Sequence, residues 1–368
     1  MLGFNFLNRL NKSCSVLLIL IMLFSSCKEE GVENAYQQRL KPDFISAVDI
    51  SNYSEIANSK PTFYNLEGNP QDFLSILKEN GINTIRLRLW VDSLGKQSRF
   101  NAVKELSKVL TNKGFKIWLT LHYSDTWADP GLQQTPPQWQ GLDLESLGDS
   151  IYNYTTRVVH ELRPNYIQIG NEINSGILHP YGIISPSNNN FIHLLQKGCS
   201  AVRNNSQECK IIVHFAGLEN ADVFYSQLNI LDYDMIGLSY YPIWHGKSLH
   251  TLENTLENLS ASHAKQIVIA ETAYPFTLEW NDWTNNIVGL DDQLILPDYP
   301  ATVEGQSDFI KEIKRITYES DKGIGFCYWG AELIAWKGEQ GTDASPWENQ
   351  ALFDFSNKAL PVLKQFKL

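Results

Sequence analysis

Residues 102–123, AVKELSKVLTNKGFKIWLTLHY, contain a helix-like segment followed at once by a strand-like one. In residues 102–113 the apolar side chains recur at helical spacing, and Gly114 stands just beyond them, where helices commonly end. Residues 116–121 form a short apolar run, which the polar His122 closes. A helix that leads directly into a buried strand is the repeating unit of a parallel α/β sheet. This stretch therefore predicts an α/β fold.

The same alternation continues along the chain from residue 43 onward. Residues 69–81, NPQDFLSILKENG, form another helix-like segment with a polar start and a closing glycine. Strand-like runs begin at residues 44, 84, 116, 166, 210, 235, 266 and 323. Eight such units, without an internal repeat or a low-complexity linker, predict one (β/α)8 TIM barrel over residues 43–368.

Polar and aromatic residues gather where these apolar runs finish, which in a TIM barrel is the face that carries the active site. The opposite ends, such as residues 114–116, carry nothing comparable. The residues at the predicted catalytic face are Asp49, Ser51, Arg86, Arg88, Trp90, His122 to Asp125, Asn171, Glu172, His214, Tyr240, Tyr241, Glu271 and Trp329.

Two of these residues are glutamates that each close an apolar strand. Glu172 follows Asn171 at the end of the fourth strand, and Glu271 ends the seventh. Strands four and seven lie on opposite sides of a barrel mouth, so their carboxyl groups can face each other across a sugar, as a retaining glycosidase requires. The alternative is that either glutamate is a structural ion-pair partner. Two acids in this arrangement favour catalysis.

Tryptophans are concentrated in the long loops after the third, seventh and eighth strands. Their flat faces suit the C–H faces of sugar rings, and we expect most of them to line a substrate groove, although any single one could instead belong to the core. They are Trp127, Trp139, Trp280, Trp283, Trp336 and Trp347.

The amino-acid composition limits the classes of binding partner that the chain can have. The chain has 368 residues, 43% of them apolar, and a formal charge of −11. A nucleic-acid-binding surface needs a basic stripe that displaces counterions, which this charge argues against. We therefore expect a neutral or small-molecule partner, no nucleic acid, and a monomer.

The N-terminus predicts export. Arg9 and Lys12 precede an apolar stretch over residues 13–24, which has the length of a signal-peptide core. The following Phe-Ser-Ser-Cys27 resembles a bacterial lipobox, and the next residues, KEE, resemble the signal that directs lipoproteins of the Bacteroides group to the outer cell surface. This predicts a signal peptide over 1–26, lipidation of Cys27, a tether over 27–42 and a place on the outer membrane of a Gram-negative bacterium. A cleaved secretory signal with an incidental cysteine is the alternative.

The remaining cysteines leave one question open. Cys199 and Cys209 lie ten residues apart in a compartment that permits disulfides, so they either pair or stay free. Cys327 lies within an apolar run and is expected to be a buried thiol. The chain contains no CxxC or HExxH motif, so no zinc site is indicated.

Eight motifs in register with the eight strands give the chain a family resemblance. They are DIS, RLRLW, HYSDTWADP, IQIGNEIN, HFAG, SYYPIWHG, ETAYP and WENQALFDF. The Asn-Glu and Glu pair resembles glycoside hydrolase clan A, and the set is similar to glycoside hydrolase family 53, the endo-β-1,4-galactanases, from about residue 43 to residue 356. The resemblance implies hydrolysis of β-1,4-galactosidic bonds in galactan or arabinogalactan side chains of pectin, with retention of configuration.

The resemblance also implies roles for single residues. Glu172 would be the acid/base, Glu271 the nucleophile and Arg86 its support; Asn171 would hold the sugar 2-hydroxyl and Tyr240 would contact the nucleophile. Trp329 would form the floor of the subsite for the attacked sugar. The other expected substrate-binding residues are Asp49, Trp90, His122, Asp125, Trp127 and Trp347; His122 could instead be a core histidine.

Two departures from the family pattern concern the loops. Bacterial members often hold calcium after the seventh and eighth strands, and here Asp282, Asn285, Asp291 and Asp292 supply hard oxygen ligands, although a solvated acidic loop is the alternative. Gly330 and Ala331, followed by Glu332, stand where the family frequently has Glu-Pro.

No cofactor is expected for the chemistry. Two other functions stay open: another clan A β-glycanase such as a β-mannanase, and a non-catalytic glycan-binding surface lipoprotein.

Overall fold

The structure is a computed structural model that describes residues 41–92, 96–184 and 187–368. The predicted signal peptide, Cys27 and most of the predicted tether lie outside these residues. Residues Phe44–Leu368 form one compact unit. No helix among the described residues has both the length and the apolar character needed to cross a membrane.

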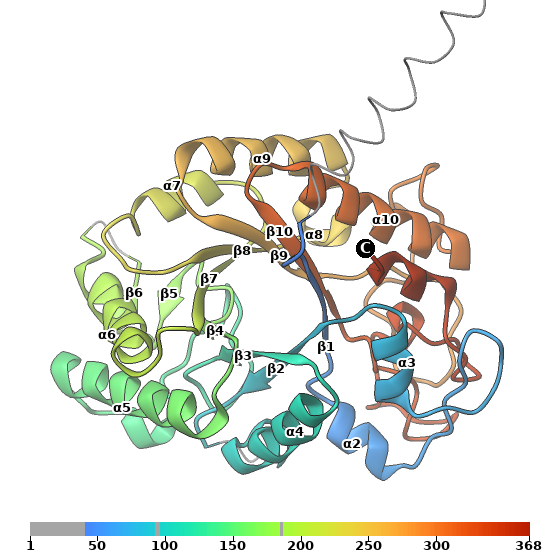
Figure 1. The fold of residues 1–368 in the computed structure, drawn as a ribbon, viewed down its shortest axis with the longest axis horizontal. Coiled ribbons are helices and arrows are strands. Elements are labelled where there is room, and N and C mark those ends of the chain that lie inside the picture. Colours follow the sequence, from blue (N-terminus) through green and yellow to red (C-terminus); the bar gives the residue numbers. More distant parts are fainter. Residues whose placement is uncertain (1–40, 93–95, 185–186) are drawn as a thin grey trace, which may run out of the picture. The chain divides into compact units, whose positions relative to one another are not determined.

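The core of this unit is a closed barrel of eight parallel strands, which confirms the predicted (β/α)8 fold (Figure 1). Around the barrel the strands follow the order β1-β10-β9-β8-β7-β4-β3-β2. They are β1 (Ile45–Asp49), β2 (Thr84–Leu89), β3 (Lys116–Leu121), β4 (Tyr166–Ile169), β7 (Lys210–Ala216), β8 (Met235–Ser239), β9 (Gln266–Thr272) and β10 (Gly323–Trp329). Each begins within a residue of the start expected from the sequence.

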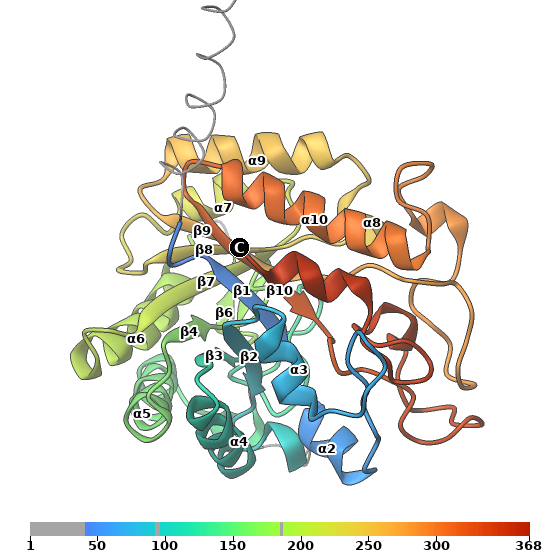
Figure 2. The same cartoon turned by 45° about the vertical axis from the view of Figure 1, so that its right-hand side comes forward.

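Helices surround the strands, as Figures 1 and 2 show. The α-helices are α2 (Tyr53–Asn58), α3 (Phe73–Glu79), α4 (Phe100–Asn112), α5 (Leu144–Leu162), α6 (Asn189–Asn205), α7 (Ala221–Ser226), α8 (Pro242–His245), α9 (Leu249–Ser262) and α10 (Val303–Glu319). Short 3₁₀ helices are η1 (Lys96–Ser98), η2 (Pro137–Trp139), η3 (Asp291–Gln293), η4 (Glu348–Gln350) and η5 (Pro361–Phe366). The eighth strand is thus followed by η4 and η5 instead of an α-helix.

The helix ends follow the local chemistry of the sequence. Asp72 caps α3 because its side chain accepts a hydrogen bond from the Ser75 N–H at 2.9 Å. Gly114 follows α4 with φ of +80°, a conformation that glycine adopts without steric cost. A small two-stranded hairpin of β5 (Gly176–Ile177) and β6 (Gly182–Ile183), which the sequence pattern did not indicate, lies in the connection from β4 to α6.

The interior of the barrel changes from apolar to polar along its axis. An apolar layer is formed by Ile45, Ala47, Trp118, Tyr166, Ile212, Met235, Val268, Ala270 and Cys327. Toward the C-terminal ends of the strands the buried side chains become charged or polar, and the strand register places Asp49 beside Arg86 and Ser239 beside Glu271. The barrel therefore presents a buried polar network at its catalytic face.

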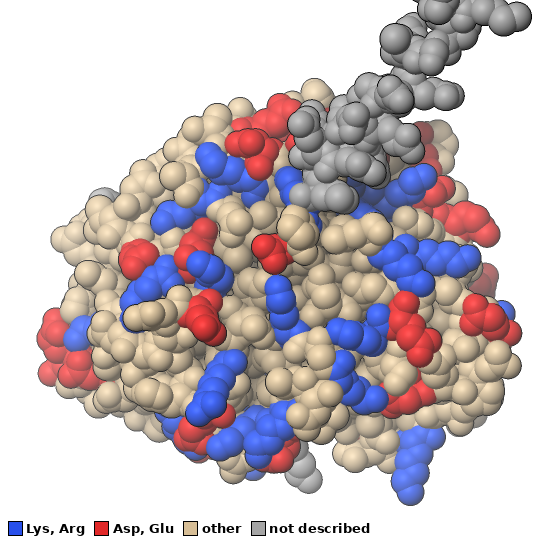
Figure 3. Space-filling model, viewed as in Figure 1, with Lys and Arg blue, Asp and Glu red and all other residues tan. Residues whose placement is uncertain are grey.

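Charged side chains on the surface are mixed in sign. On the face drawn in Figure 3, lysines and arginines lie among aspartates and glutamates. On that face the described residues form no continuous basic stripe of the kind that tracks phosphates.

Candidate active site

A pocket of about 390 Å³ opens at the C-terminal ends of the strands. Its position agrees with the rule that TIM barrels carry their sites at this face. The pocket is lined by Asp49, Arg86, Arg88, His122, Trp127, Ala128, Asp129, Pro130, Asn171, Glu172, Ala216, Tyr241, Trp244, His245, Glu271, Trp329 and Trp347.

Glu172 reaches the pocket through a sharp change of chain direction after β4. Gly170 has φ of +81°, and a Cβ atom there would lie 2.4 Å from a side-chain carbon of Ile173, so only glycine fits. Glu172 has φ of +45°, an uncommon conformation for a residue with a side chain. Such strained backbone positions occur often at functional sites.

Glu271 projects directly from β9 and is held by two donors. The Arg86 guanidinium donates to Glu271 Oε1 at 2.7 Å, and the Tyr241 hydroxyl donates to Oε2 at 3.0 Å. Arg86 also bonds Asp49 at 2.8 Å and Asn171 Oδ1 at 2.8 Å. Both oxygens of Glu271 are therefore fixed in place.

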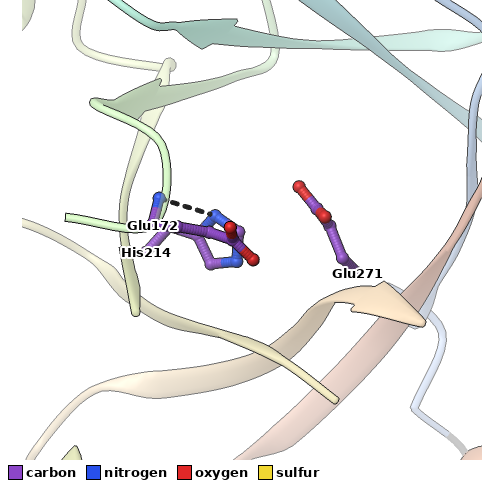
Figure 4. Close-up of side chains that lie close together, drawn as sticks. All are labelled: Glu172, His214 and Glu271. Atoms are coloured by element: carbon purple, nitrogen blue, oxygen red, sulfur yellow. Dashed lines mark hydrogen bonds between the residues drawn. The ribbon is translucent and has the colours of Figure 1, made fainter. Parts of the chain in front are cut away.

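The two glutamates approach each other from opposite sides of the barrel (Figure 4). A carboxylate oxygen of Glu172, one of Glu271 and a ring nitrogen of His214 all lie within 4.8 Å of one another. Retaining glycosidases separate their carboxyl groups by about 5–5.5 Å, whereas inverting enzymes need about 6.5–9.5 Å to admit a water. The short separation matches the retaining geometry.

The environments of the two acids differ. Burial, with the nearby charge of Glu271, raises the pKa of Glu172 to about 8. Burial also raises the pKa of Glu271, but the charge of Arg86 and the hydrogen bonds from Arg86 and Tyr241 oppose that rise. When the pair binds a single proton, the proton therefore resides on Glu172.

The expected contact of the Tyr240 side chain with the nucleophile is wrong, although the Tyr240 backbone N–H donates to the Glu271 carbonyl at 2.8 Å. Side chains alternate across a strand, and here Ser239 points into the barrel, Tyr240 away from it and Tyr241 into it again. The Tyr240 hydroxyl donates to Gly246 O at 2.9 Å and its ring stacks on Phe309 of α10, while Tyr241 contacts Glu271. Both tyrosines follow the end of β8, so the sequence could not show which of the two side chains points into the barrel.

Most of the expected substrate-binding residues line the pocket, but Trp90, Asp125 and Tyr240 do not. Trp90 is buried, and its indole N–H donates to His122 Nδ1 at 3.4 Å. Asp125 accepts from the Asp92 N–H at 2.8 Å and so fixes the neighbouring loop. His122 does line the pocket, yet it is buried, and burial together with Arg88 holds its pKa well below the usual value. The expected residues that line the pocket are Asp49, Arg86, His122, Trp127, Asn171, Trp329 and Trp347.

Two of the six loop tryptophans that were expected to line a substrate groove lie at this pocket. They are Trp127 and Trp347. Trp139 packs in the core against Tyr154, and Trp280 and Trp283 are exposed outside the pocket. Burial of a loop side chain depends on contacts with distant loops, which periodicity cannot show.

Trp244, which the sequence analysis missed, completes a continuous aromatic wall. The ring centroids of Trp329 and Trp347 lie 4.6 Å apart; Trp127 lies 6.2 Å from Trp329, and Trp244 lies 6.1 Å from Trp347. These four tryptophans are called the aromatic wall below. The sequence signal for Trp244 was its place within the SYYPIWHG motif, five residues beyond the end of β8.

The expected calcium ligands do not come together as a set. Asp291 and Asp292 are exposed on η3, and Asn285 is exposed too. Asp282 instead lies buried near Glu348, whose Oε1 accepts from the Asp282 N–H. The turn places residues 291 and 292 outward because the Gln293 side chain accepts from two backbone N–H groups within it.

Among the described residues, the only converging group of three or more potential His, Cys, Asp and Glu ligands is Glu172, His214 and Glu271. The Arg86 cation, 2.7 Å from Glu271, repels a divalent ion there, and both ring nitrogens of His214 are hydrogen-bonded. The group suits proton transfer better than metal binding.

The structure also shows the state of the three described cysteines and the position of Glu332. Cys199, Cys209 and Cys327 are all free and buried, so the first two do not pair. Glu332 is buried and accepts from the Asn52 N–H at 2.8 Å, and it does not line the pocket.

The fold and the site together define a (β/α)8 glycoside hydrolase with two facing carboxyl groups. The chain belongs to glycosyl hydrolase family 53, whose family model matches residues 45–366. The family resemblance is thereby confirmed.

Relatives cover nearly the whole barrel. The chain is 32% identical over 348 residues to an arabinogalactan endo-β-1,4-galactanase of Cellvibrio japonicus, covering 88% of this chain and 90% of the relative. It is 29% identical over 378 residues to an endo-β-1,4-galactanase of Bacillus subtilis, covering 89% and 86%. The GH53 catalytic domain of Ignisphaera aggregans superposes with a TM-score of 0.82 at 37% identity, covering 89% and 97%.

Proposed function

We propose that this protein is an endo-acting, retaining β-1,4-galactanase that cleaves galactan and arabinogalactan side chains of pectin. The observation that carries the proposal is the pair of carboxyl groups facing each other within 4.8 Å in a family 53 barrel. The galactanase names of its relatives support the choice of substrate.

In the first step, Glu271 is the nucleophile and Glu172 the acid. A Glu271 oxygen attacks the anomeric carbon while Glu172 gives its proton to the departing glycosidic oxygen, which leaves a glycosyl-enzyme ester. Arg86 and Tyr241 keep the attacking carboxylate ionised and aimed. At neutral pH Glu172 is protonated, because its pKa is raised to about 8, and it can therefore supply this proton.

In the second step, Glu172 changes role. Formation of the ester removes the negative charge of Glu271, and the pKa of Glu172 falls because that charge had helped to raise it. The ionised Glu172 then takes a proton from water, which attacks the anomeric carbon and releases Glu271. Two displacements restore the original configuration.

The other pocket residues bind the sugar. Asn171 Nδ2 donates to Ala128 O at 2.8 Å and keeps a second proton for the 2-hydroxyl. The aromatic wall offers stacking surfaces for sugar rings, and Trp127 is 41% exposed. We propose that long chains therefore bind better than short ones, since remote contacts help to orient the sugar at the cleavage point.

A panel of purified glycans tests the function. The purified protein should release reducing ends from β-1,4-galactan and from arabinogalactan carrying such chains, and not from β-mannan. Cleavage of mannan with galactan untouched would instead establish another clan A β-glycanase. Galactan binding without release of reducing ends would identify a binding protein.

We also propose that the enzyme is a monomer anchored to the outer membrane through a lipid on Cys27, because the N-terminal sequence resembles a lipoprotein signal. Cys27→Ala should move the protein from the membrane fraction of its host to a soluble fraction, with specific activity unchanged. Cys14→Ala, which alters another cysteine of the same segment, should leave fractionation as it is. A Cys27→Ala protein that still sediments with membranes contradicts the anchor.

We propose a structural calcium ion at Asp282 and Glu348. Asp282 Oδ2 and Glu348 Oε2 are buried without a hydrogen-bond partner, as is Asn286 Oδ1. A buried carboxylate oxygen without a partner is costly unless a cation or a proton compensates it, and carboxylate and amide oxygens are the ligands that calcium prefers. Bound calcium would join the loop after β9 to η4.

Removal of calcium should lower the melting temperature without changing the fold. At 100 times its dissociation constant, an ion that binds only the folded state adds about 2.7 kcal/mol, or several degrees of melting temperature. The double variant Asp282→Asn, Glu348→Gln should lose the calcium-dependent shift, whereas Asp291→Asn, Asp292→Asn should keep it. A chelator-treated wild type whose melting temperature does not respond to calcium contradicts the site.

A further inference from the structure

Beneath the pocket, three uncharged buried side chains connect Arg86 to Glu172. Gln168, His214 and Ser239 are each fully buried, and they come from β4, β7 and β8. Arg86 lies 3.4 Å from Gln168 Oε1, Gln168 Nε2 lies 2.9 Å from His214 Nδ1, and His214 Nε2 lies 2.9 Å from Ser239 Oγ. The Ser239 hydroxyl reaches Glu172 Oε1 at 2.5 Å.

The direction of these hydrogen bonds is set at the Arg86 end. A guanidinium can only donate, so the Gln168 oxygen must face Arg86. The Gln168 amide nitrogen, which is also only a donor, faces His214 Nδ1 at 2.9 Å as well as Gly170 O and Asn171 Oδ1, each at 3.0 Å. The backbone N–H of Glu172 also points at Nδ1, at 3.4 Å (Figure 4). His214 Nδ1 is therefore an acceptor.

His214 must then carry its proton on Nε2. Burial and the charge of Arg86 hold its pKa well below the usual value, so the ring is neutral and has one N–H. That N–H donates to Ser239 Oγ, and the single proton of the Ser239 hydroxyl is left to donate to Glu172 Oε1. Asn171 Oδ1, 3.3 Å from His214 Nδ1, already accepts from Arg86 and Gln168.

We propose that Ser239 and His214 are positioning residues that keep Glu172 Oε1 as an acceptor and so confine the acid proton to Oε2. This inference rests on the proposed acid/base role of Glu172. Oε2 has no hydrogen-bond partner among the described residues, and Glu172 is only partly buried, so this oxygen is available to a glycosidic oxygen in the pocket. A carboxyl group held in this way presents its proton to substrate without rotation.

The arrangement also affects the pH at which Glu172 ionises. The Ser239 donor stabilises the carboxylate and lowers the pKa of Glu172, against burial and the charge of Glu271. Loss of the donor favours the neutral acid, so the pKa rises and the acid stays protonated to higher pH. The other titratable or charged groups that face Glu172 are Arg86, Asp129, His214 and Tyr241; none of them is substituted in a Ser239 variant, and His214 loses only the acceptor of its Nε2 proton.

The test compares Ser239→Ala with wild type through the pH dependence of kcat/KM on galactan. The alkaline limb of the wild type should lie near pH 8, as the pKa of Glu172 implies. In Ser239→Ala that limb should move upward by about 1 pH unit, since a hydrogen bond to a charged group is worth at least about tenfold in the ionisation equilibrium. At the optimum, kcat/KM should fall by about 10-fold because the proton is no longer held on one oxygen.

Leaving groups give a second readout. An aryl galactoside with an acidic phenol departs without protonation, so its kcat/KM should be nearly equal in Ser239→Ala and wild type. A general packing defect would instead lower kcat/KM on galactan and on the aryl galactoside by the same factor. Ser46→Ala is the matched control, because Ser46 is a fully buried strand serine whose hydroxyl has no hydrogen-bond partner. It should leave the alkaline limb in place.

His214→Phe removes the group that donates to Ser239 and leaves Ser239 itself in place. It tests the inference if Ser239→Ala is insoluble. It should also move the alkaline limb upward, by less, because the Ser239 hydroxyl remains but is no longer oriented. An unmoved alkaline limb in a folded, active Ser239→Ala or His214→Phe protein overturns the inference. A wild type that fails to cleave galactan overturns the proposed function instead.

Discussion

Glu271→Ala is expected to be almost inactive on every β-galactoside, with kcat reduced on the order of 10⁶-fold, as when the nucleophile of another covalent hydrolase is removed. Glu172, the carboxyl group that faces it, cannot replace it, because Glu172 approaches the sugar from the opposite side (Figure 4). The measurement is release of aryl alcohol from an activated β-galactoside and of reducing ends from galactan.

Added azide should restore turnover in this variant in a diagnostic form. Azide can occupy the space left by the carboxylate and attack the anomeric carbon once, which inverts the configuration and gives an α-galactosyl azide. Glu271→Gln is the matched control for folding, since its amide oxygen can still accept from Arg86 but leaves no room for azide. It should be inactive, should melt near the wild-type temperature and should not respond to azide.

Glu172→Ala is expected to lose about 10²- to 10⁴-fold in activity on galactan, the usual contribution of general acid–base assistance. The nucleophile remains, so an aryl galactoside with an acidic phenol should still form the glycosyl-enzyme, provided the pocket accepts it. The second step lacks its base and should become slow, so a burst of phenol should precede a low steady rate.

Azide should accelerate that slow second step, because an anion needs no base. The product should be a β-galactosyl azide, since two displacements restore the starting configuration. If Glu172→Ala produced the α-azide and Glu271→Ala the β-azide, the assignments of acid/base and nucleophile would have to be exchanged.

The different roles of the two glutamates come from their partners and not from burial, which raises the pKa of both. Glu271 pairs directly with a cation at 2.7 Å. Glu172 has no direct hydrogen bond to Arg86 among the described residues; Gln168, His214 and Ser239 link the two and transmit the direction of hydrogen bonding but carry no charge. One arginine thus favours the ionised form of one acid and orients the other.

Much of the architecture could be predicted because the information is local. Alternation of helical periodicity with short apolar runs identified all eight barrel strands, since each must be covered on both faces. The position of Glu172 and Glu271 at strand ends then placed both in the site, because all parallel strands of a barrel end at one face. Arg86, Asn171 and Trp329 were found for the same reason.

Errors arose where position depends on contacts between segments far apart in the chain. Tyr240 and Tyr241 are neighbours beyond the end of β8, and only the barrel register shows which of them faces Glu271. The long loops posed the same difficulty. Trp139 is buried by Tyr154 of α5, whereas Trp244 reaches the wall through Trp347, more than 100 residues later.

The hydrogen bonds from Arg86 to Glu172 show this division most clearly. Arg86, Glu172 and His214 were identified in the sequence as polar residues near the ends of apolar strands, since backbone periodicity is a short-range property, whereas Gln168 and Ser239 were not. Which atoms meet, and hence which nitrogen of His214 and which oxygen of Glu172 carry the proton, depends on side chains from β2, β4, β7 and β8 converging inside the closed barrel. Proton positions depend on differences of a few tenths of an ångström in donor–acceptor distance. Those distances are fixed only once the barrel has closed.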